Sequence, residues 1–320
     1  MYVIRPQIKY SRKVNGFVRL FSDAPKEIRI PMPWGYIAAK EWGNPLGNPI
    51  LCYHGWQDNA GTFDRLIPLL NKKFRYIALD VAGHGFSTPY PPGMLYNVWD
   101  LVVQYHRIAQ YFNLDKFSMI GHSMGGGFGL VYASVFPAKV EKLVSLDMVK
   151  PVTVPLAWHT QDIGEAIEEN LLAEHKMLNS KPQAVPMETL VKRYVEGTLG
   201  NLSSEGARVL LKRGAAKAPN GKGYYFTRDL RQNTASIQRF SIAEQQKLLK
   251  NIRCELLLIK SKNAPSYEPD EVYREFRDLY PKYCKSFNYL EVDGGHWVHL
   301  EHPERVAPYI NEFLNSLLDF

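Results

Sequence analysis

Cysteine is scarce in this sequence of 320 residues. Only three cysteines are present, and they lie far apart, at Cys52, Cys254 and Cys284. Disulfide frameworks and cysteine-based zinc sites need closely or regularly spaced cysteines, so neither is expected. A few scattered thiols are typical of proteins in a reducing compartment. We therefore predict an intracellular protein, placed in the cytoplasm, with the peroxisome and the mitochondrion as alternatives.

Long apolar runs and dense basic blocks are also missing. No stretch of about 18 or more apolar residues occurs, which excludes a membrane-spanning helix. The net charge is +7, but 39 lysines and arginines are scattered among 32 acids, so we predict no nucleic-acid partner. Residues 1–25 are predicted to form a basic surface arm. Pro6 and Gly16 would interrupt the amphipathic helix of a transit peptide.

Apolar and aromatic residues are abundant, at 45% and 12% of the chain, which is enough for one large core. From Pro49 to Leu146, short apolar runs alternate with helical patterns such as Thr62–Leu70 and Tyr96–Phe112. This alternation predicts an α/β fold with a mostly parallel, twisted sheet that helices cover on both faces. Two alternating segments ahead of it, Lys26–Ile30 and Tyr36–Trp42, predict an antiparallel hairpin.

The pattern changes after Met148. Helical segments at Gln161–Asn179 and Pro186–Gly197 are joined by loops, and no parallel-strand pattern returns until Cys254–Lys260. This predicts a helical cap inserted into the sheet domain. The predicted organisation is a basic arm (1–25), the first part of the core (26–148), the cap (149–250) and the second part of the core (251–320).

A nucleophile elbow is predicted at Gly121-His122-Ser123-Met124-Gly125, where a short apolar run meets a helical segment. The Gly-x-Ser-x-Gly pattern makes a sharp strand-to-helix turn that exposes the serine hydroxyl. Glycines keep Cβ atoms out of this tight turn. The N-terminus of the following helix would direct backbone N–H groups at a developing oxyanion. We therefore predict Ser123 as the nucleophile.

A second backbone N–H for the oxyanion hole is expected from the loop after the strand Pro49–Tyr53. That loop begins His54-Gly55-Trp56, and the N–H of Trp56 is the predicted donor beside that of Met124. His54 is predicted to be a structural hydrogen-bonding residue. Asp80 and His84 precede the nucleophile, contrary to the order serine, acid, histidine, and are predicted to hold loops.

The general base is predicted to be His296, which follows the last predicted strand and two glycines. A neutral imidazole can accept the serine proton and return it to a leaving group. His299 and His302 lie nearby, but their spacing does not favour a metal site, and no metal or organic cofactor is predicted.

The orienting acid is predicted to be Asp147, at the end of the strand Val140–Leu146 and 24 positions after Ser123. Catalytic groups in parallel sheets gather outside the carboxyl ends of the strands. The loop 261–264, another usual location, holds no carboxylate. Glu268 and Asp270 remain alternatives, and Asp293 is a weaker one whose expected role is in a turn.

Together these motifs resemble the alpha/beta-hydrolase fold, and more narrowly the serine hydrolase-like proteins related to insect kraken. The acid spacing also resembles that of haloalkane dehalogenases, which, like epoxide hydrolases of this fold, use an aspartate nucleophile. Because this chain has Ser123 in place of the nucleophilic aspartate, the resemblance implies acyl transfer. The motifs that carry the resemblance are His54-Gly55-Trp56-Gln57-Asp58-Asn59, Gly83-His84-Gly85, Gly121-His122-Ser123-Met124-Gly125-Gly126, Phe226-Thr227-Arg228-Asp229 and Gly294-Gly295-His296-Trp297.

The predicted activity is two-step hydrolysis of a small hydrophobic, ester-like substrate through an acyl-enzyme. Carbon–carbon bond hydrolysis, a cofactor-free peroxidase-like activity and non-catalytic binding of a small ligand remain alternatives. Four aromatic residues are predicted to form the substrate pocket: Trp56, Tyr224, Tyr225 and Trp297. The choice among ester, thioester and amide substrates is left open, as is the oligomeric state.

Overall fold

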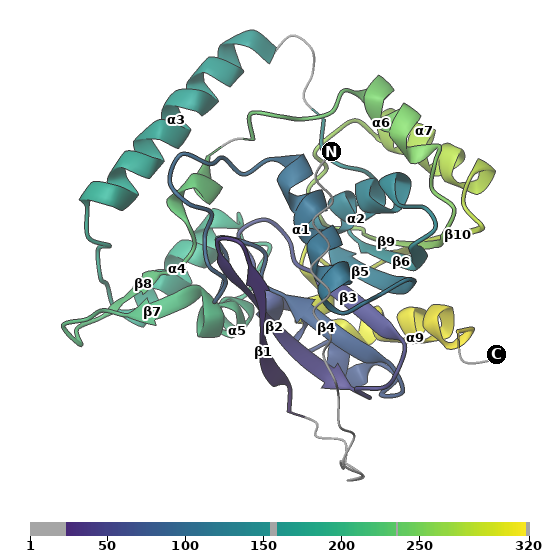
Figure 1. The fold of residues 1–320 in the computed structure, drawn as a ribbon, viewed down its shortest axis with the longest axis horizontal. Coiled ribbons are helices and arrows are strands. Elements are labelled where there is room, and N and C mark those ends of the chain that lie inside the picture. The colour runs from purple at the N-terminus through teal and green to yellow at the C-terminus, as the bar shows by residue number, and fades with distance from the viewer. Residues whose placement is uncertain (1–23, 154–158, 235, 318–320) are drawn as a thin grey trace, which may run out of the picture.

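The computed structural model describes residues 24–153, 159–234 and 236–317 of the chain, and within them the central sheet has eight strands (Figure 1). The strands are β1 (Lys26–Met32), β2 (Gly35–Gly43), β3 (Pro49–Tyr53), β4 (Arg75–Leu79), β5 (Phe117–His122), β6 (Val140–Leu146), β9 (Glu255–Ser261) and β10 (Ser286–Val292). Their order is β1-β2-β4-β3-β5-β6-β9-β10. Strand β2 is antiparallel to both of its neighbours, and the other pairs are parallel. The mostly parallel sheet and the opening hairpin were both predicted.

Helices cover both faces of the sheet, as the continuous apolar strands require. In β4, Ile77 and Leu79 belong to one apolar cluster and Tyr76 and Ala78 to the other, because successive side chains of a strand point to opposite faces. The first face is covered by α1 (Val98–Tyr111), α2 (Met124–Val135), α6 (Ile242–Leu249) and α7 (Asp270–Leu279). The second face is covered by two 3-10 turns (Ala60–Phe63 and Ile67–Leu69) and by α9 (Ala307–Asn315).

The single helix predicted over Thr62–Leu70 is wrong. The chain forms two short 3-10 turns there, and Pro68 lies in the first turn of the second. Proline has no N–H and its ring collides with the preceding turn, so an α-helix cannot pass through it. Phe63 and Ile67 are nevertheless buried against the sheet, so the apolar spacing did identify the face that packs on the core.

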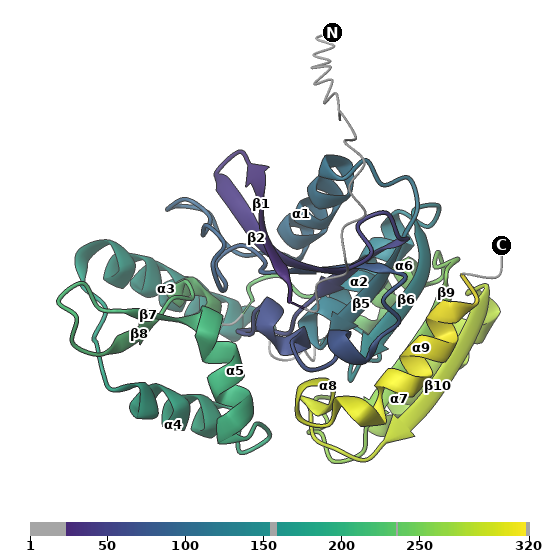
Figure 2. The ribbon, with the colours of Figure 1, turned by 90° about the horizontal axis from the view of Figure 1, so that it is seen from below.

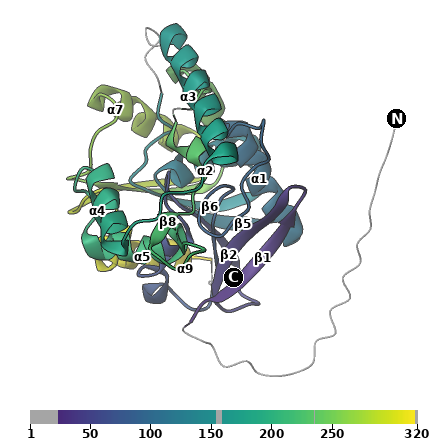
Figure 3. The same ribbon diagram turned by 90° about the vertical axis from the view of Figure 1, so that its left-hand side faces the viewer.

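Residues 159–234, here called the cap, lie between β6 and β9 in the chain and beside the sheet in space (Figure 2). The cap contains α3 (His159–Asn179), α4 (Met187–Gly197), α5 (Ser204–Gly214) and the antiparallel pair β7 (Ala215–Lys217) and β8 (Tyr224–Phe226). In Figure 3, α4, α5 and β8 form one group and α3 rises away from it.

Two features of the cap region differ from a purely helical insertion. The aromatic segment Tyr224–Phe226 is a strand that pairs with β7 across the glycine-containing turn. Helix α6, which lies inside the predicted insertion, packs on α2 of the core.

The domain boundaries themselves stay a prediction. The predicted basic arm lies outside the described residues except for its last two residues. None of the helices in the described part of the chain is both long and apolar enough to cross a bilayer.

A buried ion pair joins the cap to the core. Arg213 of α5 donates to both carboxylate oxygens of Asp80, which follows β4, and to Glu27 of β1. The side chains of Arg213 and Asp80 are 4% and 0% exposed. Asp80 also accepts the backbone N–H groups of Ala60 and Phe86, in agreement with its predicted loop-holding role.

Replacing Arg213 by methionine is expected to lower the free energy of unfolding by about 3 kcal/mol, because the carboxylate of Asp80 would stay buried without its cation. Urea denaturation measures this change. Arg208→Met, on the same helix, is the matched control, since its ion pair with Glu188 is solvent-exposed and its removal should leave the midpoint nearly unchanged. Equal midpoints for the two variants would contradict the expectation.

Candidate active site

Ser123 lies in a strained turn between a fully buried strand and a helix. Strand β5 ends at His122, Ser123 has φ 50° and ψ −118°, and α2 begins at the next residue. A non-glycine residue rarely adopts a positive φ, and such strain is concentrated at functional sites. A Cβ atom on Gly121 would lie 2.4 Å from the backbone oxygen of Gly125, which explains why this turn needs glycine. The sharp strand-to-helix turn predicted at Ser123 is therefore present.

The structure brings Asp147 and His296 together, although they are distant in the chain. The Nδ1 atom of His296 is 2.5 Å from Oδ2 of Asp147. The other carboxylate oxygen accepts the backbone N–H of Ser261 at 2.9 Å and the Nζ of Lys260 at 2.6 Å. Both side chains are buried, and Asp147 itself has φ 51°. A carboxylate held in this way keeps the proton of the imidazole on Nδ1 and leaves the lone pair on Nε2.

The other acids weighed from the sequence have different partners. Glu268 accepts the N–H and hydroxyl of Thr153 and forms a buried ion pair with Lys150. Asp270 is exposed in the first turn of α7, and Asp293 pairs on the surface with Lys262. Within the described residues, only Asp147 among these four carboxylates contacts His296.

His122, the residue that precedes Ser123, contacts His296. The Nε2 atom of His122 is 3.0 Å from the backbone oxygen of His296, and their rings are 4.7 Å apart. In the described part of the chain the hydroxyl of Ser123 makes no hydrogen bond to His296 or to another group. Catalytic hydrogen bonds are often long in unliganded enzymes and tighten when a substrate binds. Ser123 lines a cavity from which a substrate could reach its hydroxyl.

The two predicted oxyanion donors are unpaired. No hydrogen bond among the described residues uses the backbone N–H of Trp56 or of Met124. The N–H of Met124 belongs to the first turn of α2, where such groups have no partner within the helix. The loop that carries Trp56 is held by buried histidines: His54 accepts from the N–H of Val81, and His84 from the N–H of Gln57. Burial lowers the pKa of both histidines, which suits neutral acceptors.

A buried polar network next to the elbow had not been predicted. Asp58 accepts from the indole N–H of Trp297 at 3.0 Å and from the hydroxyl of Tyr194 in α4 at 3.3 Å. Its Oδ2 atom is also 3.3 Å from Nδ1 of His122. Asp58 thereby links the elbow, the loop of His296 and the cap. The only signal for this network in the sequence was the position of Asp58 close to Trp56, because the partners of Asp58 are 64 to 239 positions away.

The other two histidines of the predicted cluster do not gather around a common centre. His299 is buried and bonds the hydroxyl of Thr62 at 2.8 Å, whereas His302 is near the surface beside Glu304. Across the residues that the structure describes, no group of three or more His, Cys, Asp or Glu side chains is arranged to hold a metal ion.

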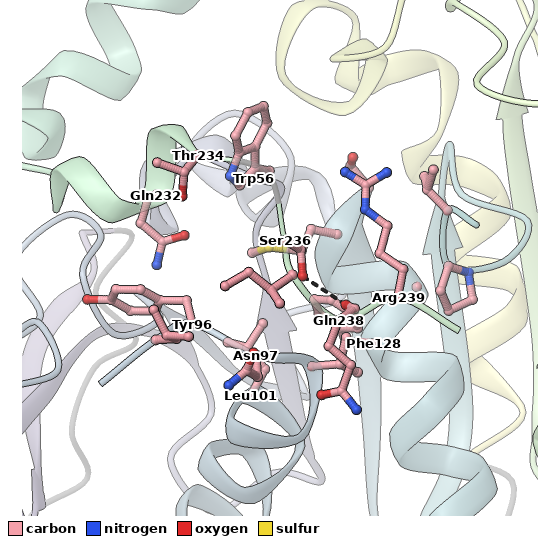
Figure 4. A pocket seen from close by; sticks show the side chains of 18 of the residues that line it. Trp56, Tyr96, Asn97, Leu101, Phe128, Gln232, Thr234, Ser236, Gln238 and Arg239 are labelled. Atoms are coloured by element: carbon pink, nitrogen blue, oxygen red, sulfur yellow. Dashed lines mark hydrogen bonds between the residues drawn. The ribbon is translucent and has the colours of Figure 1, made fainter. Parts of the chain in front are cut away.

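A cavity of about 380 Å³ opens beside Ser123 (Figure 4). Trp56 lines it, as predicted. Tyr224, Tyr225 and Trp297 do not: Tyr224 and Trp297 pack against the apolar cluster of the cap, and Tyr225 lies in the short strand β8. The lining comes instead from the starts of α1 and α2, the loop 148–152, residues from 231–234 and 236–240, and Tyr267. Sequence patterns did not identify residues 231–234 and 236–240 as lining, because they lie far along the chain from the predicted catalytic residues.

Burial lowers the pKa of His296 below its ordinary value of 6.5, and the hydrogen bond to Asp147 opposes this shift only in part. If His296 is the base, its neutral form is the active one. We therefore expect activity to persist as the pH falls through 6.5 and to be lost at a lower pH. The test is kcat/KM measured from about pH 4 to about pH 9. His302→Gln should leave the acidic limb in place, and a limb centred above 6.5 would contradict the expectation.

Comparison with known proteins shows the family to which this chain belongs. A family model described as alpha/beta hydrolase fold matches residues 48–303. A "Probable serine hydrolase" of Drosophila melanogaster is 34% identical over 97% of this chain and 96% of its own length. "Serine hydrolase-like protein 2" of Homo sapiens is 35% identical over 90% of this chain and 93% of its own. A solved structure of a hypothetical protein from Pseudomonas aeruginosa PAO1 has a TM-score of 0.79 at 29% identity, covering 92% of this chain and 99% of that one. This chain therefore belongs to the alpha/beta hydrolase fold family and is serine hydrolase-like.

Proposed function

We propose that the protein is a serine hydrolase that cleaves a small ester-like substrate, a carboxylic ester or thioester, through an acyl-enzyme. The observation that carries the proposal is the pairing of buried Asp147 with His296 beside a serine in a strained turn. These three residues would act as acid, base and nucleophile. The cavity beside the serine is of a size that suits a small ligand.

Acylation would begin when Nε2 of His296 accepts the proton of the Ser123 hydroxyl. The serine oxygen attacks the carbonyl carbon, and the electron pair of the carbonyl bond moves to its oxygen. The N–H groups of Met124 and Trp56 would stabilise this oxyanion, and one such donor typically contributes about 3 kcal/mol to transition-state stabilisation. When the carbonyl re-forms, the bond to the leaving group breaks and His296 returns the proton to that group.

Deacylation would repeat these steps with water. His296 accepts a proton from the water molecule while its oxygen attacks the acyl carbon. Collapse of the second tetrahedral intermediate breaks the bond to Ser123 and releases the acid, and the imidazole returns the proton to the serine. The fixed Asp147 stabilises the imidazolium that forms in each half-reaction. The Drosophila and human relatives, which are named as a probable serine hydrolase and a serine hydrolase-like protein, support the same reaction class.

The direct test is labelling with a fluorophosphonate, which phosphonylates activated serines. We expect close to one adduct per folded chain, and peptide mass spectrometry should place it on Ser123. Other buried serines, such as Ser134 and Ser145, should stay unmodified because each donates its hydroxyl to a backbone carbonyl.

Absence of labelling in correctly folded protein would contradict the proposal and favour a protein that only binds a ligand. If the protein is labelled, a fresh sample without the probe is then assayed against p-nitrophenyl esters and thioesters of increasing acyl length. Cleavage of ester-like bonds separates the proposal from carbon–carbon hydrolysis, which uses a similar set of residues. Labelling without cleavage of any ester or thioester would favour that alternative.

A further inference from the structure

The cavity beside Ser123 carries positive charge that ester hydrolysis itself does not use. Among the described residues, its lining includes two arginines, Arg231 and Arg239, and neither aspartate nor glutamate. The wall near the nucleophile is largely apolar and includes Met124 and Phe128. The two guanidinium groups therefore stand in a lining that supplies no counter-charge of its own.

The charge of Arg231 is already neutralised. Its guanidinium contacts both carboxylate oxygens of Asp229 and donates to the backbone oxygens of Tyr90, Pro91 and Met94. A second acid, Glu174 of α3, lies 3.6 Å away. The Arg231 side chain is 2% exposed, and its N–H donors hold the loop 90–94 against the cap. Arg231 is thus a structural residue in the wall.

Arg239 differs from Arg231 in having no partner among the described residues. It is half-buried, and it forms no hydrogen bond or ion pair with any residue that the structure describes. Its neighbour Ser236 bonds to the backbone oxygen of Gln238. Figure 4 shows the Arg239 side chain across the cavity from Tyr96 and Gln232. A guanidinium keeps its charge at every physiological pH and presents its donors as a planar fork.

We propose that Arg239 binds a carboxylate at the end of the substrate that is remote from the scissile carbonyl. The substrate class would then be a monoester or monothioester of an aliphatic dicarboxylic acid, whose methylene chain lies along the apolar wall. One guanidinium matches the two oxygens of one carboxylate. A phosphate dianion would leave a second charge uncompensated in this lining, so a carboxylate fits better. The identity of the bond that is cleaved rests on the proposed function.

The test compares p-nitrophenyl monoesters of adipic, pimelic and suberic acid with p-nitrophenyl hexanoate, heptanoate and octanoate. Each pair has the same chain length and differs in the terminal carboxylate. We expect wild type to favour the anionic ester at one or more lengths. Arg239→Gln should lower the ratio of kcat/KM for the anionic over the neutral ester by about tenfold to a hundredfold, mainly through KM. Arg239→Lys, which keeps the charge but loses the fork, should give an intermediate ratio.

Arg208→Gln is the matched control. It removes the same charge from an exposed position of the cap, so it should leave the ratio unchanged if the effect of Arg239 is local. Equal ratios in wild type and Arg239→Gln at every chain length would overturn the inference while leaving the proposed hydrolase intact.

If no ester is cleaved, calorimetry with monomethyl adipate and monomethyl pimelate, which each carry a single carboxylate, decides the question without turnover. Binding that Arg239→Gln weakens would support the carboxylate site even if the proposed reaction is wrong. Absence of binding to wild type, or equal binding to both proteins, would overturn the site.

Discussion

Asp147→Asn is expected to lower kcat/KM by about 10⁴-fold. The carboxylate accepts the Nδ1 proton of His296, whereas an asparagine amide can donate to Nδ1 and so hold the imidazole in the wrong tautomer. The N–H of Ser261 and the Nζ of Lys260 would still hold the side chain in place, so binding should change less than turnover. Steady-state kinetics with the best ester of the screen measures both parameters.

Glu268→Gln is the control for this prediction. Glu268 is another partly buried acid, but it pairs with Lys150 and Thr153 instead of His296. We expect Glu268→Gln to lower the stability of the protein more than its turnover. Thermal denaturation of both variants separates the two effects. Near-normal turnover of Asp147→Asn together with a large loss in Glu268→Gln would assign the acid role to Glu268.

Ser123→Ala is expected to lower kcat by roughly 10⁶-fold and to abolish fluorophosphonate labelling. Removal of the hydroxyl deletes the nucleophile while leaving the oxyanion donors and the cavity in place, so ligand binding should persist. The substitution keeps the Cβ atom, but it does not remove the backbone strain at φ 50°. Pre-steady-state mixing with a p-nitrophenyl ester should show a burst in wild type if deacylation is slow, and no burst in this variant.

Ser134→Ala is the matched control on the same helix. Ser134 is buried near the C-terminal end of α2 and bonds the carbonyl of Leu130, one turn earlier. It should retain turnover and labelling. Hydrolysis by Ser123→Ala at a wild-type rate would remove the serine from the mechanism and contradict the proposed acyl-enzyme.

The outline of the fold could be predicted from local patterns. The buried strands β3, β4 and β5 appear as short apolar runs, and the elbow at Ser123 follows one of them directly, so neighbouring residues contain the whole signal. The wrong predictions concern segments in which the local sequence pattern competes with a proline or with packing against distant residues. Pro68 divided a segment with helical spacing into two turns, and Tyr224 and Trp297 joined the apolar cluster of the cap instead of the cavity.

The succession of strands and helices and the strand-to-helix turn at Ser123 could be predicted from the sequence alone, because each depends on residues close together in the chain or on their succession. The pairing of Asp147 with His296, the network around Asp58 and the isolated charge of Arg239 required the folded chain. Each depends on which distant side chains the sheet and the cap bring into contact. Local propensities carry no information about such contacts, since a carboxylate or guanidinium has the same neighbours in sequence whether it is paired or left open to a ligand.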